Sequence, residues 1–74
     1  MIYLLIPPRE IHNEFNMDDY PDLIFKSPHN RLKACVNGDI NEILNNNFCL
    51  VEIQNASVSK VFTIDEVKKL LLLL

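Results

Sequence analysis

The stretch that decides the fold is Phe48–Leu74, FCLVEIQNASVSKVFTIDEVKKLLLLL. Its first part is rich in β-branched and aromatic residues, and we expect strands over Phe48–Gln54 and Val58–Phe62, joined by a turn at Asn55-Ala56-Ser57. Alternation along the first strand assigns one face to Cys49, Val51 and Ile53 and the other to Leu50, Glu52 and Gln54. Lys60 interrupts the apolar side of the second strand. An inward Lys discourages further pairing, which predicts that this strand lies at an edge of the sheet.

The helix that follows these strands has its own start signal. Thr63-Ile64-Asp65-Glu66 matches a capping box, in which the Thr63 hydroxyl accepts from the Glu66 N–H and the Glu66 carboxylate accepts from the Thr63 N–H. Acidic residues lie near the positive end of the helix dipole, and two lysines follow toward its negative end. We therefore expect a helix that begins near Ile64.

The five consecutive leucines that end this stretch are more than one helix face requires. Helical spacing assigns the inner face to Ile64, Val67, Leu70, Leu71 and Leu74. Leu72 and Leu73 fall on the charged side, so they need cover from elsewhere. Three explanations stay open: the same fold wraps them, a second copy or a partner protein covers them, or the sequence is the truncated end of a longer protein. The run is too short for a membrane span, which needs about 20 apolar residues.

Two further strands are expected earlier in the chain. Ile2–Ile6 is a continuous apolar run that ends at two prolines, which predicts a strand buried on both faces in the middle of the sheet. Leu23–Phe25 is a second, shorter run of the same kind. Between them, Glu10–Asn16 allows a short helix that Ile11 and Phe15 would anchor.

Two short helices are expected next, and Leu32–Leu44 reads as a tight helix–turn–helix. Ser27-Pro28 places a capping Ser before a Pro at the first helical position. Gly38, the only glycine, suits a left-handed C-cap, and Asp39 suits the cap of the second helix. The segment Ala34–Ile40 resembles the helical hairpin of an ankyrin repeat. It occurs once, without the usual Thr-Pro-Leu-His opening, and ankyrin arrays need several stacked units, so this family is not assigned.

The length of 74 residues predicts a single domain, 1–74. A chain this short buries only about 60% of its unfolded surface, and small folds usually add disulfides, metal or oligomerisation. The chain does not open with a signal-peptide pattern, so we expect a cytoplasmic protein. In that compartment Cys35 and Cys49 read as small buried hydrophobes rather than as a disulfide, which leaves oligomerisation as the expected support.

The net charge of −3 does not favour nucleic-acid binding, which draws on Lys and Arg neutralising phosphates. The alternative that we keep is a small nucleic-acid-associated regulator that uses the helical unit 31–47, with Arg31, Lys33 and Asn45–Asn47. The abundance of Asn, Ile, Leu and Lys is typical of an AT-rich genome, such as that of a phage or another mobile element, and indicates a viral protein.

The sequence shows no pattern typical of a catalytic or metal site. The His and Cys residues that could ligate zinc are His12, His29, Cys35 and Cys49. Zinc sites usually show ligand pairs separated by two to four residues, and these residues do not form such pairs. The acidic residues Asp18, Asp19 and Asp22 lack the glycine turn of a cation-binding loop. We therefore expect no metal, no cofactor and no catalytic residue.

These observations predict an α+β fold, with a small, mostly antiparallel β-sheet covered by a helical hairpin and a C-terminal helix. The leading hypothesis for function is a non-enzymatic protein–protein interaction module. It would act as a small self-associating regulator, inhibitor or assembly subunit, as a homodimer or with another protein. The residues expected at the interface are Leu70, Leu72, Leu73 and Leu74.

Overall fold

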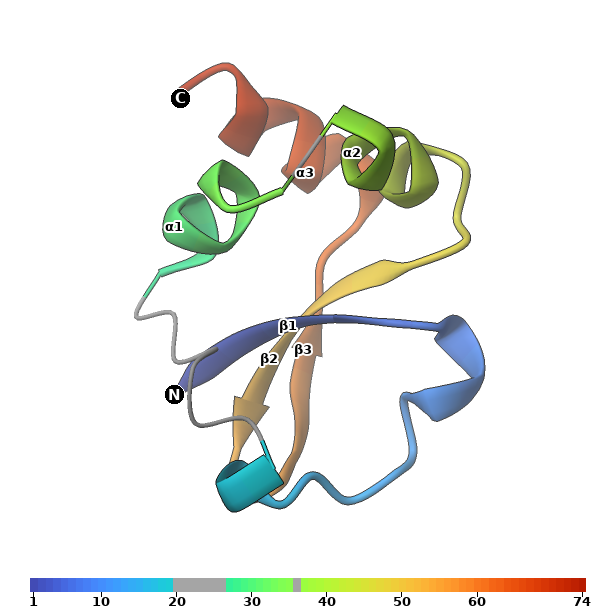
Figure 1. Ribbon diagram of the computed structural model, residues 1–74, viewed down its shortest axis with the longest axis vertical. Coiled ribbons are helices and arrows are strands. Elements are labelled where there is room, and N and C mark those ends of the chain that lie inside the picture. Colours follow the sequence, from blue (N-terminus) through green and yellow to red (C-terminus); the bar gives the residue numbers. More distant parts are fainter. Residues whose placement is uncertain (20–26, 36) are drawn as a thin grey trace.

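The computed structural model describes residues 1–19, 27–35 and 37–74 and shows an α+β fold (Figure 1). Its antiparallel sheet consists of β1 (Ile2–Ile6), β2 (Cys49–Gln54) and β3 (Ser57–Val61). The helices are α1 (Pro28–Lys33), α2 (Asn37–Leu44) and α3 (Ile64–Leu71), which lie together in the upper half of Figure 1. The predicted class and the mostly antiparallel sheet are confirmed. The predicted strand at 23–25 lies outside the described residues.

The middle strand of the described sheet is β2, which pairs with β1 on one side and with β3 on the other. The prediction that the first strand takes the middle position is therefore wrong for this sheet. β1 pairs with β2 along its whole length, from Ile2 opposite Ile53 to Ile6 opposite Cys49. The edge position predicted for β3 is confirmed.

Alternation along the strands divides the apolar side chains between two cores, one on each face of the sheet. The loop-side core consists of Ile2, Leu4, Ile6, Phe15, Val51 and Ile53. The helix-side core consists of Tyr3, Leu32, Ile43, Leu50 and Val67, and it receives one residue from each helix. β1 is therefore buried on both faces, as its apolar run predicts, and the faces predicted for Cys49–Ile53 are confirmed.

The first helix starts as the sequence predicts. Ser27 precedes Pro28 at the N-terminus of α1, and its hydroxyl accepts a hydrogen bond from the Asn30 N–H at 3.2 Å. α1 ends at Lys33, followed by Ala34 with helical φ and ψ. It packs against α3 and β1. The predicted cover of the sheet by a helical hairpin stays a prediction, since residue 36 between α1 and α2 lies outside the described residues.

The glycine does not cap the first helix. Gly38 lies in the first turn of α2 with a φ that is not positive, so the roles predicted for Gly38 and Asp39 are wrong. The left-handed residue comes at the other end of α2, where Asn46 has φ 63°. There the Asn47 N–H donates to the Glu42 carbonyl at 2.9 Å, which is the hydrogen bond of a Schellman motif. Asn46 takes the position that glycine usually occupies.

Residues 8–19 contain two short 3₁₀ turns, Pro8–Glu10 and Met17–Asp19, and the helix allowed over Glu10–Asn16 is not formed. Phe15 nevertheless acts as the predicted anchor, because its side chain is buried in the loop-side core. Its backbone N–H donates to the Ala56 carbonyl at 2.7 Å. This segment is thereby attached to the turn between β2 and β3.

The β2–β3 hairpin has a tight turn and an irregular pairing. Asn55 and Ala56 form the turn with φ values of 54° and 67°, both in the left-handed region. Glu52 lies opposite Lys60 whereas Ile53 lies opposite Val58, so Ser59 is an extra residue in β3. This bulge was not predicted. It sets Lys60 on the same face as Glu52, toward the helices.

Candidate protein-interaction surface

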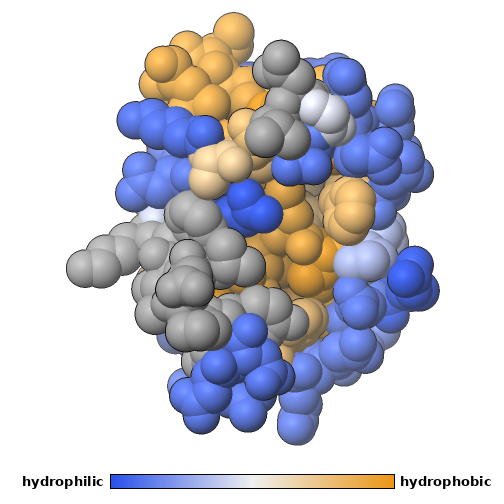
Figure 2. Space-filling view, viewed as in Figure 1, coloured by the Kyte–Doolittle hydropathy of each residue, from blue (hydrophilic) through white to orange (hydrophobic). Residues whose placement is uncertain are grey.

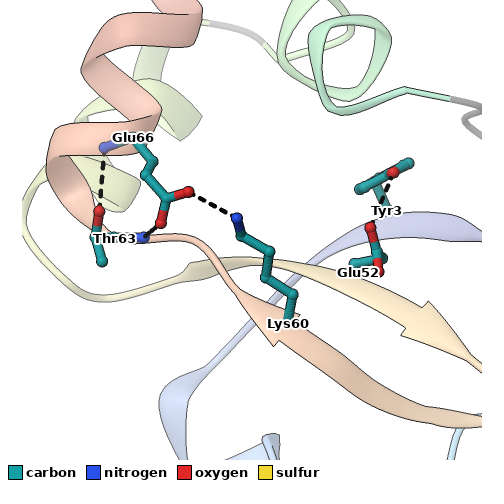
Figure 3. Close-up of polar contacts among 5 residues, drawn as sticks. All are labelled: Tyr3, Glu52, Lys60, Thr63 and Glu66. Carbon is teal, nitrogen blue, oxygen red and sulfur yellow. Dashed lines mark hydrogen bonds and ion pairs between the residues drawn. The ribbon is translucent and has the colours of Figure 1, made fainter.

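The capping box at the start of α3 is present as predicted (Figure 3). The Glu66 N–H donates to the Thr63 hydroxyl, and the Thr63 N–H donates to Glu66 Oε1, each at 3.1 Å. Two backbone N–H groups that a helix start leaves unpaired are thus satisfied. The box fixes the direction in which α3 leaves β3.

The same carboxylate also binds the neighbouring strand. Lys60 Nζ lies 2.8 Å from Glu66 Oε2 and 4.8 Å from the centroid of the Phe62 ring. The hydrogen bond from Lys60 lowers the pKa of Glu66, and the same bond raises the pKa of Lys60. Both side chains are partly solvent-exposed, so the contact orients β3 and α3 more than it stabilises them.

A second polar contact lies beside this pair under the helices. The Tyr3 hydroxyl donates to Glu52 Oε2 at 3.1 Å, and the Tyr3 and Phe62 rings meet edge to face at 6.2 Å. Burial raises the pKa of Tyr3, and the hydrogen bond to Glu52 adds to the rise. Tyr3 and Phe62 are thereby held in place, which matters because Phe62 also reaches the surface.

The leucines at the end of α3 are half-buried, and those that follow the helix are exposed. Val67 is fully buried, and Leu70 and Leu71 are half-buried against the helix-side core. The helix then ends at Leu71, and 85% of Leu72, 72% of Leu73 and 49% of Leu74 are exposed. Figure 2 shows an orange patch at the top, where Figure 1 places the C-terminal end of the chain.

Two predictions about this segment are therefore corrected. The inner position predicted for Leu74 is wrong, because α3 ends at Leu71 and the last residues continue in 3₁₀ hydrogen bonds, from the Leu73 N–H to Leu70 and from the Leu74 N–H to Leu71. The explanation that the same fold wraps Leu72 and Leu73 is also wrong, as their exposure shows. Cover by a second copy or by a partner protein stays a prediction.

A shallow pocket of about 220 Å³ lies beside the exposed leucines. It is lined by Phe62, Glu66, Lys69, Leu70 and Leu73. We call Phe62, Leu70, Leu72, Leu73 and Leu74 together the leucine surface. Phe62 and Lys69 were not among the residues predicted for the interface, because the place of Phe62 beside Leu73 depends on how the chain turns between β3 and α3.

The other groups considered from the sequence do not form a site in the described part of the chain, and Asp22 lies outside it. Among the described residues, no three His, Cys, Asp or Glu side chains are placed to hold a metal ion. Cys35 packs on the helix-side core and Cys49 on the loop-side core, so the sheet separates them. Burial raises the pKa of both thiols, which disfavours the nucleophilic thiolate.

The basic residues of the alternative hypothesis lie on α1. Arg31 Nη1 donates to Cys35 Sγ at 3.7 Å and is half-buried, whereas Lys33 is exposed. Asn45–Asn47 are exposed at the end of α2. A nucleic-acid role for this region stays a prediction.

No helix in the described part of the chain has the length and apolar character needed to cross a membrane. The chain matches no protein-family model, no curated protein and no solved structure. The case for a function therefore depends on the geometry of the leucine surface.

Proposed function

We propose that this protein is a non-enzymatic protein–protein interaction module that acts through the leucine surface. The observation that carries the proposal is the exposure of Leu72 and Leu73, at 85% and 72%, on a segment whose preceding helix is firmly anchored. Exposed apolar patches rimmed by polar residues are typical of interaction sites. The module would serve as a small regulator, inhibitor or assembly subunit, and self-association is its simplest form.

The anchoring of the surface supports this proposal. α3 is fixed at its start by the capping box and the Lys60–Glu66 pair, and along its length by the buried Val67. Because α3 is anchored, the backbone that carries the leucines has less conformational freedom to lose on binding. Phe62 adds an aromatic side chain, a residue type enriched in interface cores.

The test is a binding assay with immobilised chain, as wild type and as the double variant Leu72→Asp/Leu73→Asp. Each is incubated with purified untagged copies of the chain and, separately, with extract of the native cell. We expect capture by the wild type and loss of capture by the double variant. A protein captured from the extract counts only after it is identified, purified and shown to bind directly.

A matched control is Asn13→Asp, which adds a negative charge at an exposed position in the segment 8–19, away from the C-terminal end in Figure 1. This variant should bind as the wild type does. Circular dichroism should show the same helix content for every variant, since Leu72 and Leu73 follow the last helical residue. Equal capture by the wild type and the double variant, or capture by neither, would overturn the proposal.

A further inference from the structure

We infer that the leucine surface is occupied by α3 of a second copy of this chain, packed antiparallel to the first about a twofold axis. The inference rests on the proposed function and specifies its partner. A twofold contact requires a surface that is complementary to itself, with the same patch used by both copies. The distribution of charge and apolar groups along α3 meets this requirement.

The charges of α3 are divided along its axis. Asp65 and Glu66 lie in the first turn, and Lys68 and Lys69 lie in the last. A parallel neighbour would set acid against acid and base against base, whereas an antiparallel neighbour sets each acidic end against a basic end. The two helix dipoles are also opposed in the antiparallel arrangement, which favours it further.

One register satisfies both the charges and the leucines. In two antiparallel helices related by a twofold axis, positions whose numbers have the same sum lie at the same level. When Asp65 of one copy is level with Lys69 of the other, Leu71 of one copy is level with the cap residue Thr63 of the other, so Leu72 extends just past the start of the second α3, where Phe62 precedes Thr63. Phe62 is one of the residues that line the pocket. The charge pairing therefore directs the most exposed leucine toward the end of the second copy's pocket that Phe62 lines.

The charged residues and the pocket lie on neighbouring sides of α3. Asp65, Lys69 and Leu72 follow one another at helical spacing, and Glu66, Leu70 and Leu73 form the adjacent row. The first row supplies the charges and the projecting leucine, and the second row lies along the pocket. A second copy that covers both rows would bury Leu72 and Leu73 of each chain at once.

The experiment is a charge exchange followed by light scattering and sedimentation at tens of micromolar chain. Lys69→Glu places a negative charge opposite Asp65 of the second copy. Asp65→Lys places a positive charge opposite Lys69 of the second copy. Each variant alone should associate at least about tenfold more weakly than the wild type, because repulsion occurs twice in a twofold dimer. An equimolar mixture of the two variants should restore the dimer, because both cross-copy pairs become attractive.

Other outcomes separate this inference from the proposed function. If the wild type associates through its leucines but the mixture fails to restore the dimer, the antiparallel arrangement falls and the proposed function stands. Self-association of Lys69→Glu alone as strong as that of the wild type would indicate parallel helices, in which residue 69 faces its own counterpart, and would equally overturn the inference.

A wild-type chain that stays monomeric overturns the inference. In that case leucine-dependent capture of an identified protein preserves the proposed function. Leucine-dependent binding to vesicles of equal parts phosphatidylcholine and phosphatidylserine would show a lipid surface as the occupant, and both proposals would then fall. Asn13→Asp serves as the control for added charge in each assay.

Discussion

Glu66 and Lys60 form the contact that joins the sheet to the last helix, with Lys60 Nζ 2.8 Å from Glu66 Oε2 while Oε1 accepts the Thr63 N–H at 3.1 Å. One carboxylate thus completes the helix cap and orients the edge strand. The direction of α3, and with it the position of the leucine surface, depends on this side chain.

Glu66→Gln should therefore change how stability depends on pH. The pKa of Glu66 is lowered in the folded state, so its contribution is complete above the unfolded carboxylate pKa of about 4.3 and is lost as the pH falls through the lower folded value. The urea midpoints of wild type and Glu66→Gln should differ at neutral pH and converge in acid. Glu14→Gln, which removes a charge at an exposed position in the segment 8–19, is the control. Curves that stay parallel down to the most acidic pH would contradict the prediction.

The same pair predicts an effect at alkaline pH. The pKa of Lys60 is raised by Glu66, so the contribution of the ammonium is complete below the unfolded Lys pKa of about 10.4 and is lost as the pH rises through the higher folded value. Lys60→Met should remove this part of the alkaline loss of stability while preserving most of the apolar side chain. Lys33→Met on α1 is the control. The urea midpoint above pH 10 is the measurement.

Ala56→Gly should stabilise the fold. Ala56 has φ 67°, where an L-residue with a Cβ carries a strain of about 1–2 kcal/mol. The greater freedom of glycine in the unfolded chain offsets about 0.4–1 kcal/mol of the gain, so a net increase of about 0.5–1 kcal/mol in the free energy of unfolding is expected. Urea denaturation measures it. Ala34→Gly, at φ −79°, should instead destabilise, and a loss of stability in Ala56→Gly would refute the account.

Gly38→Ala should also stabilise the fold, because the backbone at this position suits a residue with a Cβ. Gly38 lies in α2 without a positive φ, and a Cβ added there would meet no atom within 4 Å. Replacing a helical glycine with alanine should add about 0.5–1 kcal/mol to the free energy of unfolding, measured in the same urea series. Had Gly38 been a left-handed cap, the substitution would destabilise, so the sign of the change distinguishes the two structures.

The two thiols should react slowly. Burial raises the pKa of both Cys35 and Cys49, so little thiolate exists near neutral pH. Alkylation of the folded chain by iodoacetamide, followed by mass spectrometry, should be several-fold slower than alkylation in urea. The folded chain should also form no internal disulfide, because the two residues pack on opposite faces of the sheet. Equal rates in the folded and unfolded chain would contradict the prediction.

Local signals in the sequence predicted the starts of α1 and α3 but not that of α2. Thr63 and Ser27 form the expected caps because the hydrogen bonds involved join residues only three apart. The position of Gly38 was not predictable in this way, since whether a glycine ends one helix or begins the next depends on how the chain packs between them. Asn46 took the left-handed position instead, at the end of α2.

In the sheet and in the candidate surface, the local pattern of the sequence was likewise predictive, whereas features that depend on distant parts of the chain were not. Alternation predicted the two faces of β2, but the middle strand depends on pairing between Ile2–Ile6 and a segment more than forty residues away. The excess of leucine predicted that Leu72 and Leu73 need cover but left its source open, and their exposure excludes cover by the same fold. Phe62 could not be added from spacing alone, because its place beside Leu73 results from the turn of the chain between β3 and α3.

The extra residue at Ser59 limits what the outer strand can do. Its hydroxyl donates to Glu52 Oε1 at 2.8 Å, which holds the irregularity in place and interrupts the regular repeat of the strand. An edge strand with an interrupted repeat is a poor template for hydrogen-bonded pairing with a strand of another chain. Growth into fibrils by strand addition at β3 is thereby discouraged.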